Sequence, residues 1–235
     1  MSGWKGLLGR TLGPDSWINK GVEHARQNRH KEACECFDRA LQIDPQCSLA
    51  WVNKGGGLNA LGCYEESIRC YEQALAINPR DAAALTNMGK NLASRDRHDQ
   101  AVRWYDEALA TDPRFARAWS AKGYSLMKQG LPEEAIRCCE QALEMEPQSA
   151  FALVVKAQCL LFFRRPDDAL ACCERASEID STIVLAWMYK GASEYQLGHR
   201  AEAKRSFQTF LDRAQGRYPM EELFARSALK TLEKT

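Results

Sequence analysis

The 235 residues include 32 Lys and Arg against 31 Asp and Glu, so the formal net charge is only +1. This balance argues against a nucleic-acid-binding protein, which needs a basic surplus to neutralise phosphates. The chain is 45% hydrophobic and 27% charged, as in ordinary globular proteins, and no apolar run approaches the roughly 20 residues that span a bilayer.

Residues 1–13 contain Trp4, Leu7, Leu8 and Leu12 among four glycines. They make a poor secretion signal because they lack a continuous apolar stretch. Three hypotheses remain open for this N-terminal segment: a short helix that folds over the residues after it, a mobile tail, or a docking segment that contacts a partner through Trp4 and its leucines.

From residue 14 onward the sequence repeats with a period of 34 residues. Pro45, Pro79, Pro113 and Pro147 follow one another at this spacing, and tryptophans and glycines keep the same register. A fixed period of this length is typical of stacked supersecondary units. The period predicts six units without insertions: 14–47, 48–81, 82–115, 116–149, 150–183 and 184–217.

Each unit has the pattern of two helices. Large residues at positions 4 and 24 alternate with small ones at positions 8, 20 and 27, so two helix backbones can approach closely. A turn residue such as Asn28 or Gly62 near position 15 ends the first helix. Proline at position 32 ends the second helix, because proline cannot continue a helix and biases the residue before it toward extended geometry.

The pattern resembles the tetratricopeptide repeat: aromatic or Leu at 4, Gly or Ala at 8, Leu at 11, Ala at 20, aromatic at 24, Ala at 27 and Pro at 32. The resemblance implies an all-α fold, a right-handed superhelix (α-solenoid) of six helix-turn-helix repeats, that binds an extended peptide or a partner helix in its concave groove. His24, Ser181, Glu194 and Phe210 depart from the pattern, mostly in the terminal repeats, where departures are expected.

Residues 218–235 follow the last repeat. The stretch from Pro219 to Leu232 is amphipathic, with Leu223, Phe224, Ala228 and Leu229 among its apolar residues. We therefore expect a thirteenth helix that caps the end of the repeat array.

The ten cysteines include no Cys-x-x-Cys pair, and only four histidines are present. Cys36, Cys70, Cys138 and Cys172 keep the register of the repeat, which favours structural thiols at helix interfaces. Metal binding or disulfide formation is the less favoured alternative. We expect no metal, no cofactor and a reducing, cytoplasmic location.

Positions 2, 5, 6, 9, 12 and 13 of each unit lie on the helix side opposite the core positions and should line the groove. Asparagines recur at position 6 in the first half, where amides can bond a peptide backbone, and apolar and aromatic residues dominate the second half. Two alternatives remain: asparagine is also tolerated on exposed helices, and curvature or the cap could cover the apolar strip. The predicted contact residues are Asn19, Asn53, Asn87, Lys90, Arg117, Tyr124, Phe151, Val155, Phe162 and Tyr189.

No catalytic motif is present, neither a nucleophile elbow nor a His-Glu-x-x-His zinc site, so we expect no enzyme activity and no catalytic residue. The leading hypothesis is an adaptor that binds a protein or peptide in the groove. The alternatives are a scaffold that self-assembles into a homo-oligomer and an accessory subunit of a larger complex.

Overall fold

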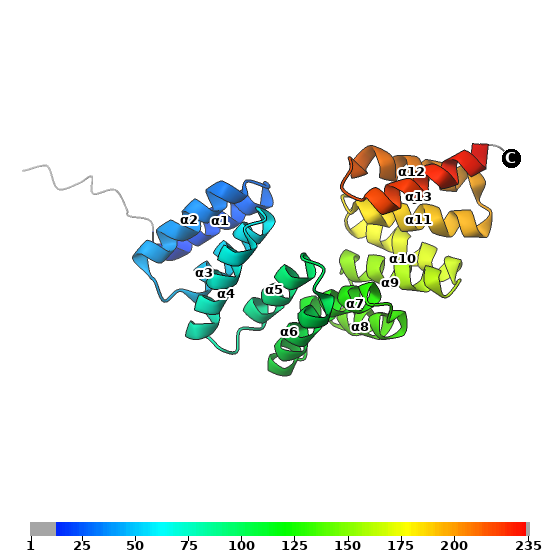
Figure 1. The fold of residues 1–235 in the computed structure, drawn as a ribbon. Coiled ribbons are helices and arrows are strands. Elements are labelled where there is room, and N and C mark those ends of the chain that lie inside the picture. Colours follow the sequence, from blue (N-terminus) through cyan, green and yellow to red (C-terminus); the bar gives the residue numbers. More distant parts are fainter. Residues whose placement is uncertain (1–12, 234–235) are drawn as a thin grey trace, which may run out of the picture. The chain divides into compact units, whose positions relative to one another are not determined.

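The computed structural model describes residues 13–233 and divides into two compact units, one up to Asp112 and one from Pro113. Within the described residues the structure contains thirteen helices and no strand (Figure 1). Residues 1–12, with Trp4 and its leucines, and residues 234–235 lie outside the described part. The three hypotheses for the N-terminal segment therefore stay predictions.

The first unit holds three helix pairs, and the two helices of each pair pack against each other. Each pair falls within one predicted 34-residue unit. The helices are α1 (Pro14–Arg26), α2 (His30–Ile43), α3 (Ser48–Ala60), α4 (Tyr64–Ile77), α5 (Ala82–Ala93) and α6 (His98–Thr111).

The second unit holds three further pairs and a last single helix. Its helices are α7 (Ala116–Lys128), α8 (Pro132–Met145), α9 (Ala150–Phe162), α10 (Pro166–Ile179), α11 (Val184–Leu197), α12 (Arg200–Ala214) and α13 (Pro219–Glu233). The thirteen helices of the described residues are consistent with six repeats and a cap; the division at the predicted boundaries stays a prediction.

The turn inside every pair contains one residue in the left-handed region, always at position 15 of the unit. These residues are Asn28, Gly62, Asp96, Gly130, Arg164 and Gly198. Glycine and, less readily, asparagine and aspartate accept this conformation. Arg164, with a φ of 52°, is the exception, because it has a β carbon that crowds the backbone and lacks the short polar side chain through which Asn and Asp can form local hydrogen bonds.

The second helix of each of the first five pairs ends two residues before position 32. Helix α10 follows this rule even though Ser181 replaces the proline. Here Asp180 accepts hydrogen bonds from the backbone N–H (2.9 Å) and the hydroxyl (2.6 Å) of Thr182, forming an Asx turn. These hydrogen bonds from Thr182 also lower the pKa of Asp180. Asp44 and Asn78 form the same turn with Gln46 and Arg80 where the proline is present, so the turn at the end of the helix persists without the proline.

The two helices of a pair touch through a glycine on the first and a ring on the second. A β carbon at Gly55 would overlap the ring of Tyr71, and Gly21, Gly89 and Gly191 face Phe37, Tyr105 and Phe207 in the same way. In the fifth pair Ala157 replaces the glycine, and the smaller Cys173 occupies the ring position. In the fourth pair the glycine is kept, but Gly123 faces the small thiol of Cys139 in place of a ring. In five of the six pairs a glycine on the first helix therefore leaves room for the residue at position 24 on the second.

Helix α13 packs on α12 and, over fewer residues, on α11, as expected for a cap (Figure 1). Ala225, Ala228 and Leu232 are buried in the core that α9 to α13 share. The ring of Tyr218, just before α13, lies 6.2 Å from that of Phe210. None of the helices described between residues 13 and 233 combines the length and apolarity needed to cross a lipid bilayer.

Candidate functional site

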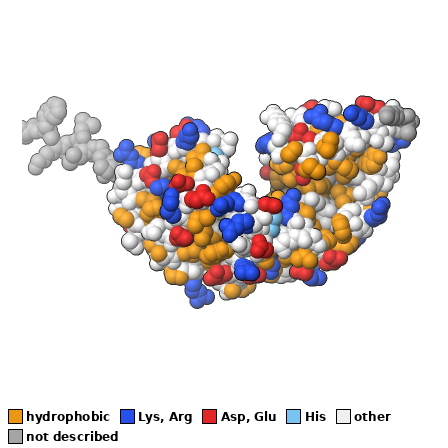
Figure 2. All heavy atoms as spheres, viewed as in Figure 1, with side chains coloured by type: hydrophobic (Ala, Val, Ile, Leu, Met, Phe, Trp, Pro, Cys, Tyr) orange, Lys and Arg blue, Asp and Glu red, His pale blue; other side chains and the backbone are white. Residues whose placement is uncertain are grey.

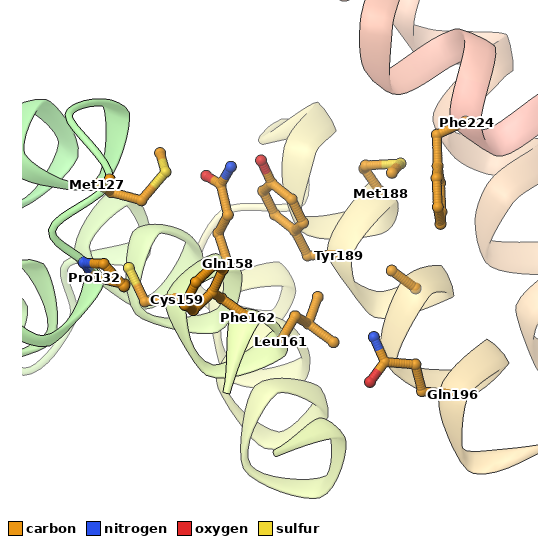
Figure 3. A pocket seen from close by; sticks show the side chains of 12 residues that line it. Met127, Pro132, Gln158, Cys159, Leu161, Phe162, Met188, Tyr189, Gln196 and Phe224 are labelled. Atoms are coloured by element: carbon orange, nitrogen blue, oxygen red, sulfur yellow. The ribbon is translucent and has the colours of Figure 1, made fainter. Parts of the chain in front are cut away.

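An open pocket of about 420 Å³ lies on the second unit, between α7, α9, α11 and α13. We call it the apolar groove. Figure 3 shows Met127 and Pro132 on one side, Met188 and Phe224 on the other, and the Tyr189 ring between them. The lining residues are Met127, Gly130, Pro132, Gln158, Cys159, Leu161, Phe162, Met188, Tyr189, Ala192, Gln196 and Phe224.

Most of these side chains come from the first helices of three successive pairs. On α9 and α11 the groove takes residues at repeat positions 5, 6, 9, 12 and 13, which one side of a helix presents together, and Cys159 at position 10. Helix α9 contacts both α7 and α11, so the three helices form a continuous wall. Neighbouring repeats thereby bring apolar residues that are 34 positions apart into one surface.

The groove is apolar and partly exposed. The side chain of Phe162 is 72% exposed, and its ring meets Phe163 edge-on at 5.4 Å. Figure 2 shows hydrophobic side chains gathered on one side of the second unit. Two methionines and an aromatic rim make a surface that adapts to large apolar side chains. An exposed apolar surface of this kind is typical of an interaction site.

Two carboxylates lie close to residues that line the groove. Glu133 follows Pro132 at the start of α8, and Glu221 lies one helical turn before Phe224 on α13. Burial, assisted by the Glu133 carboxylate, raises the pKa of the Cys159 thiol to about 11.

The second carboxylate acts on the tyrosine of the groove. Burial and then the negative charge of Glu221 raise the pKa of the Tyr189 phenol. The Cys159 thiol and the Tyr189 phenol therefore stay protonated at neutral pH, and each has a carboxylate close enough to act on it.

Four of the predicted contact residues of the second unit lie together at this surface. Phe162 and Tyr189 line the groove. The ring of Tyr124 lies 5.9 Å from that of Phe151, which is 43% exposed, and Tyr124 is close enough to influence Tyr189. Lys128 lies over the Tyr124 ring at 5.6 Å. The structure thus places four aromatic residues from α7, α9 and α11 on one side of this unit.

Arg117, also predicted as a contact residue, is exposed near the start of α7. Its guanidinium lies over the ring of Phe115, 5.3 Å from the ring centre. It is not among the residues that line the groove.

Val155 requires a correction. Its side chain is only 2% exposed, so it is not accessible to a ligand in this structure. It stands in the middle of α9, where α7 and α11 pack on either side, and these neighbours cover the centre of the helix. Tyr189 is also mostly buried, at 6% exposure, yet it reaches the groove with part of its ring.

In the first unit the predicted residues follow the first helices of the three pairs. Asn19 on α1 and Lys90 on α5 are exposed, whereas Asn53 on α3 and Asn87 on α5 are half-buried. Helix α3 contacts both α1 and α5, so the asparagines belong to neighbouring helices. Their role in binding stays a prediction.

Sequence reasoning missed Phe224 as a groove residue. It lies in the last helix, outside the repeat register, and its apolar neighbours suggested that it packs inside the cap. The structure instead leaves it half-exposed at the groove, with its ring 6.0 Å from Phe207. Cys159 and Gln158 were missed as well, and the first of these stands at position 10, outside the predicted inner positions.

The arrangement supports contact rather than covalent chemistry. The ten cysteines, all within the described residues, are free, and seven of them are buried. Burial raises the pKa of Cys139 and Cys173, so their thiols are poor nucleophiles at neutral pH. Between residues 13 and 233 no cluster of three or more His, Cys, Asp or Glu side chains could hold a metal ion.

Solved structures of similar fold come from several proteins. One is a thermophilic tetratricopeptide-repeat protein of Thermus thermophilus, TTC0263, with a TM-score of 0.68 and 20% identity over 77% of this chain and 98% of that one. A second is pilF of Pseudomonas aeruginosa, with a TM-score of 0.72 and 19% identity over 91% and 97%. A third is the Cut9–Hcn1 complex of the APC/C, with a TM-score of 0.83 and 14% identity over 94% and 43%. At these identities the likeness shows the fold.

No curated protein shows significant sequence similarity to the chain. Three family models of the tetratricopeptide repeat do match it, at residues 14–47, 46–114 and 116–149. The matches cover more than half of the chain, and the all-α solenoid of helix pairs agrees with them. The chain therefore belongs to the tetratricopeptide-repeat family, whose fold serves protein–protein interaction.

Proposed function

We propose that the protein is a non-enzymatic adaptor whose second unit binds a partner helix or extended peptide in the apolar groove. The observation that carries the proposal is the exposed aromatic rim of the groove, above all Phe162. A phenylalanine that contributes nothing to the interior but extends an apolar pocket is best explained by a ligand that covers it.

The size and composition of the groove suit a large apolar side chain of a ligand, which would anchor the ligand there. Its volume of about 420 Å³ lies within the range of small-molecule and peptide pockets. The amides of Gln158 and Gln196 can bond the backbone of a ligand, while Met127 and Met188 adapt to its apolar side chains.

The first unit supplies a second contact surface in this proposal. The amides of Asn19, Asn53 and Asn87 would bond the backbone of a peptide, and Lys90 would add a positive charge. The predicted cytoplasmic location fits the ten free cysteines, because such thiols persist in a reducing compartment.

The test is a pull-down with purified protein carrying Phe162→Ser, compared with wild type and with Met220→Ser. Met220, on α13, is 73% exposed and lies outside the groove, so it matches Phe162 in exposure and unit. We expect Phe162→Ser to lose the partners that wild type and Met220→Ser retain, with unchanged melting temperatures. Tyr189 is avoided because its substitution would also disturb the core.

Recovery of the same partners by Phe162→Ser and wild type would overturn the groove assignment. Light scattering over a range of concentrations separates the adaptor from the self-assembling scaffold, because only the scaffold grows in mass with concentration.

A further inference from the structure

The charges beside the groove restrict what it binds. Glu133 on α8 follows the groove residue Pro132, and Glu221 on α13 lies one turn before Phe224. Neither lines the pocket itself, but each is close enough to act on a residue that does, Glu133 on Cys159 and Glu221 on Tyr189. Neither carboxylate forms an ion pair with another described side chain, whereas the neighbouring Glu222 is paired with Arg226 at 3.7 Å. The two acids are therefore left to meet charges from outside.

The basic groups that adjoin the groove in the sequence make other contacts. Lys128 follows Met127, and its ammonium lies over the Tyr124 ring. Arg165, beyond the end of α9, is paired with Asp168 at 2.7 Å. Two carboxylates without a described ion pair therefore stand beside an apolar surface, although the whole chain is nearly neutral.

We propose that the groove selects segments of another protein in which one or two large apolar anchors are flanked by Lys or Arg and not by Asp or Glu. This inference rests on the proposed function and adds the chemistry of the partner. The anchors contact Phe162, Met188 and Phe224, and the flanking cations meet Glu133 and Glu221. Complementary charges of this kind select partners and accelerate association, while like charges exclude the wrong ones.

The experiment measures binding of two labelled synthetic peptides to the full chain by fluorescence anisotropy. Both peptides carry the same amphipathic spacing of Leu and Phe; one has Lys at every polar position, and the other has Glu. We expect the Lys peptide to bind about tenfold or more tightly at low salt, and the preference to fall as added salt shortens the range of the charges.

The double variant Glu133→Gln/Glu221→Gln identifies the residues responsible. This variant should bind the Lys peptide roughly three- to tenfold more weakly than wild type, since both acids are partly exposed. Its affinity for the Glu peptide should be unchanged or slightly higher. The matched control is Glu134→Gln/Glu233→Gln, which removes the same charge from the same two helices at positions that line other parts of the surface. The control should bind the Lys peptide nearly as tightly as wild type.

The outcomes separate the charge inference from the groove itself. If both peptides bind equally and Phe162→Ser abolishes both, the groove stands and the selection of basic segments is wrong. If neither peptide binds, or if binding survives Phe162→Ser, both the inference and the proposed function fail. If the protein alone forms oligomers that the double variant disrupts, the occupant is a second copy and the inference is overturned.

Discussion

Two neighbouring glycines in α3 should respond oppositely to the same substitution. A β carbon at Gly55 would lie 2.8 Å and 2.9 Å from the Cδ1 and Cζ atoms of Tyr71, whereas one at Gly56 would meet no atom within 4 Å. Both residues lie inside the helix, so alanine gains a similar helix propensity at each, about 0.5–1 kcal/mol. The two variants then differ only in the contact with the ring.

The magnitude follows from how firmly the ring and the backbone are held. Tyr71 is fully buried, and the carbonyl of Gly55 accepts a hydrogen bond of 2.8 Å from the hydroxyl of Ser67 on α4. Neither side can move away cheaply, so overpacking should cost about 1–3 kcal/mol. Gly56→Ala should therefore stabilise the protein, and Gly55→Ala should be about 1–3 kcal/mol less stable than Gly56→Ala.

Urea denaturation followed by far-ultraviolet circular dichroism measures the difference. The urea midpoint of Gly56→Ala should be higher than that of wild type, and the midpoint of Gly55→Ala should be lower than that of Gly56→Ala. The dependence of the unfolding free energy on urea should be the same for both variants. Equal midpoints for the two variants would show that the helix pair separates freely to admit a methyl group, and the packing argument would be wrong.

Three further predictions rest on single contacts. Glu194 is 4% exposed and accepts a hydrogen bond of 2.6 Å from the Ser206 hydroxyl, and burial raises its pKa. The raised pKa contributes stability that is present at low pH and is lost as the pH rises through the pKa of Glu194 in the folded protein. The melting temperature of Glu194→Gln should therefore not show this decrease with pH. Trp119 donates from Nε1 to the Pro113 carbonyl at 2.9 Å, whereas the buried Nε1 of Trp187 has no partner; substitution by Phe should cost about 0.5–1.5 kcal/mol more at Trp119 in urea titrations. In native protein a thiol reagent should modify Cys139 and Cys173 last, because both thiols are fully buried and burial raises their pKa, and urea should abolish this delay, as read by peptide mass spectrometry.

The Nε1 of Trp187 is unpaired because of the residue at position 32 before it. The same comparison between repeats shows why the fold could be predicted. At Pro45 and Pro113 the backbone carbonyl accepts from the indole N–H of a tryptophan six residues later, Trp51 and Trp119. Ser181 replaces the proline before Trp187, and its carbonyl accepts instead from Arg213, whose guanidinium also lies over the Trp187 ring. The period of 34 residues predicted the helix pairs because many such positions agree, and a single replacement changes a hydrogen bond without moving a helix end.

Arg164 occupies a turn position at which the repeat pattern does not predict the residue type. Its backbone adopts the left-handed conformation that Gly62 or Gly130 adopts in other pairs, since the two helices fix the direction of the turn. The packing of the helices therefore overrides the local preference of the residue, which a pattern of turn residues does not reveal.

Only part of the groove could be predicted from the sequence, and the reason is geometric. A helical wheel gives the direction of a side chain, and so it placed Val155 and Phe162 on the same wall; it gives no distance to the next helix. Val155, at the middle of α9, is covered by its neighbours, and Phe162, at the last turn, is not.

The other half of the groove comes from α13, which has no repeat register to place it. Phe224 lines the groove from this helix, and Glu221, one turn before it, acts on Tyr189. An aperiodic element therefore supplies part of the apolar lining and a carboxylate close to it. Substitutions on the exposed side of α13 leave the stacked pairs intact, because only Ala225, Ala228 and Leu232 of that helix are buried in the core. The repeats thus position most of the groove, and substitutions in the cap should change the chemistry beside it independently of the fold.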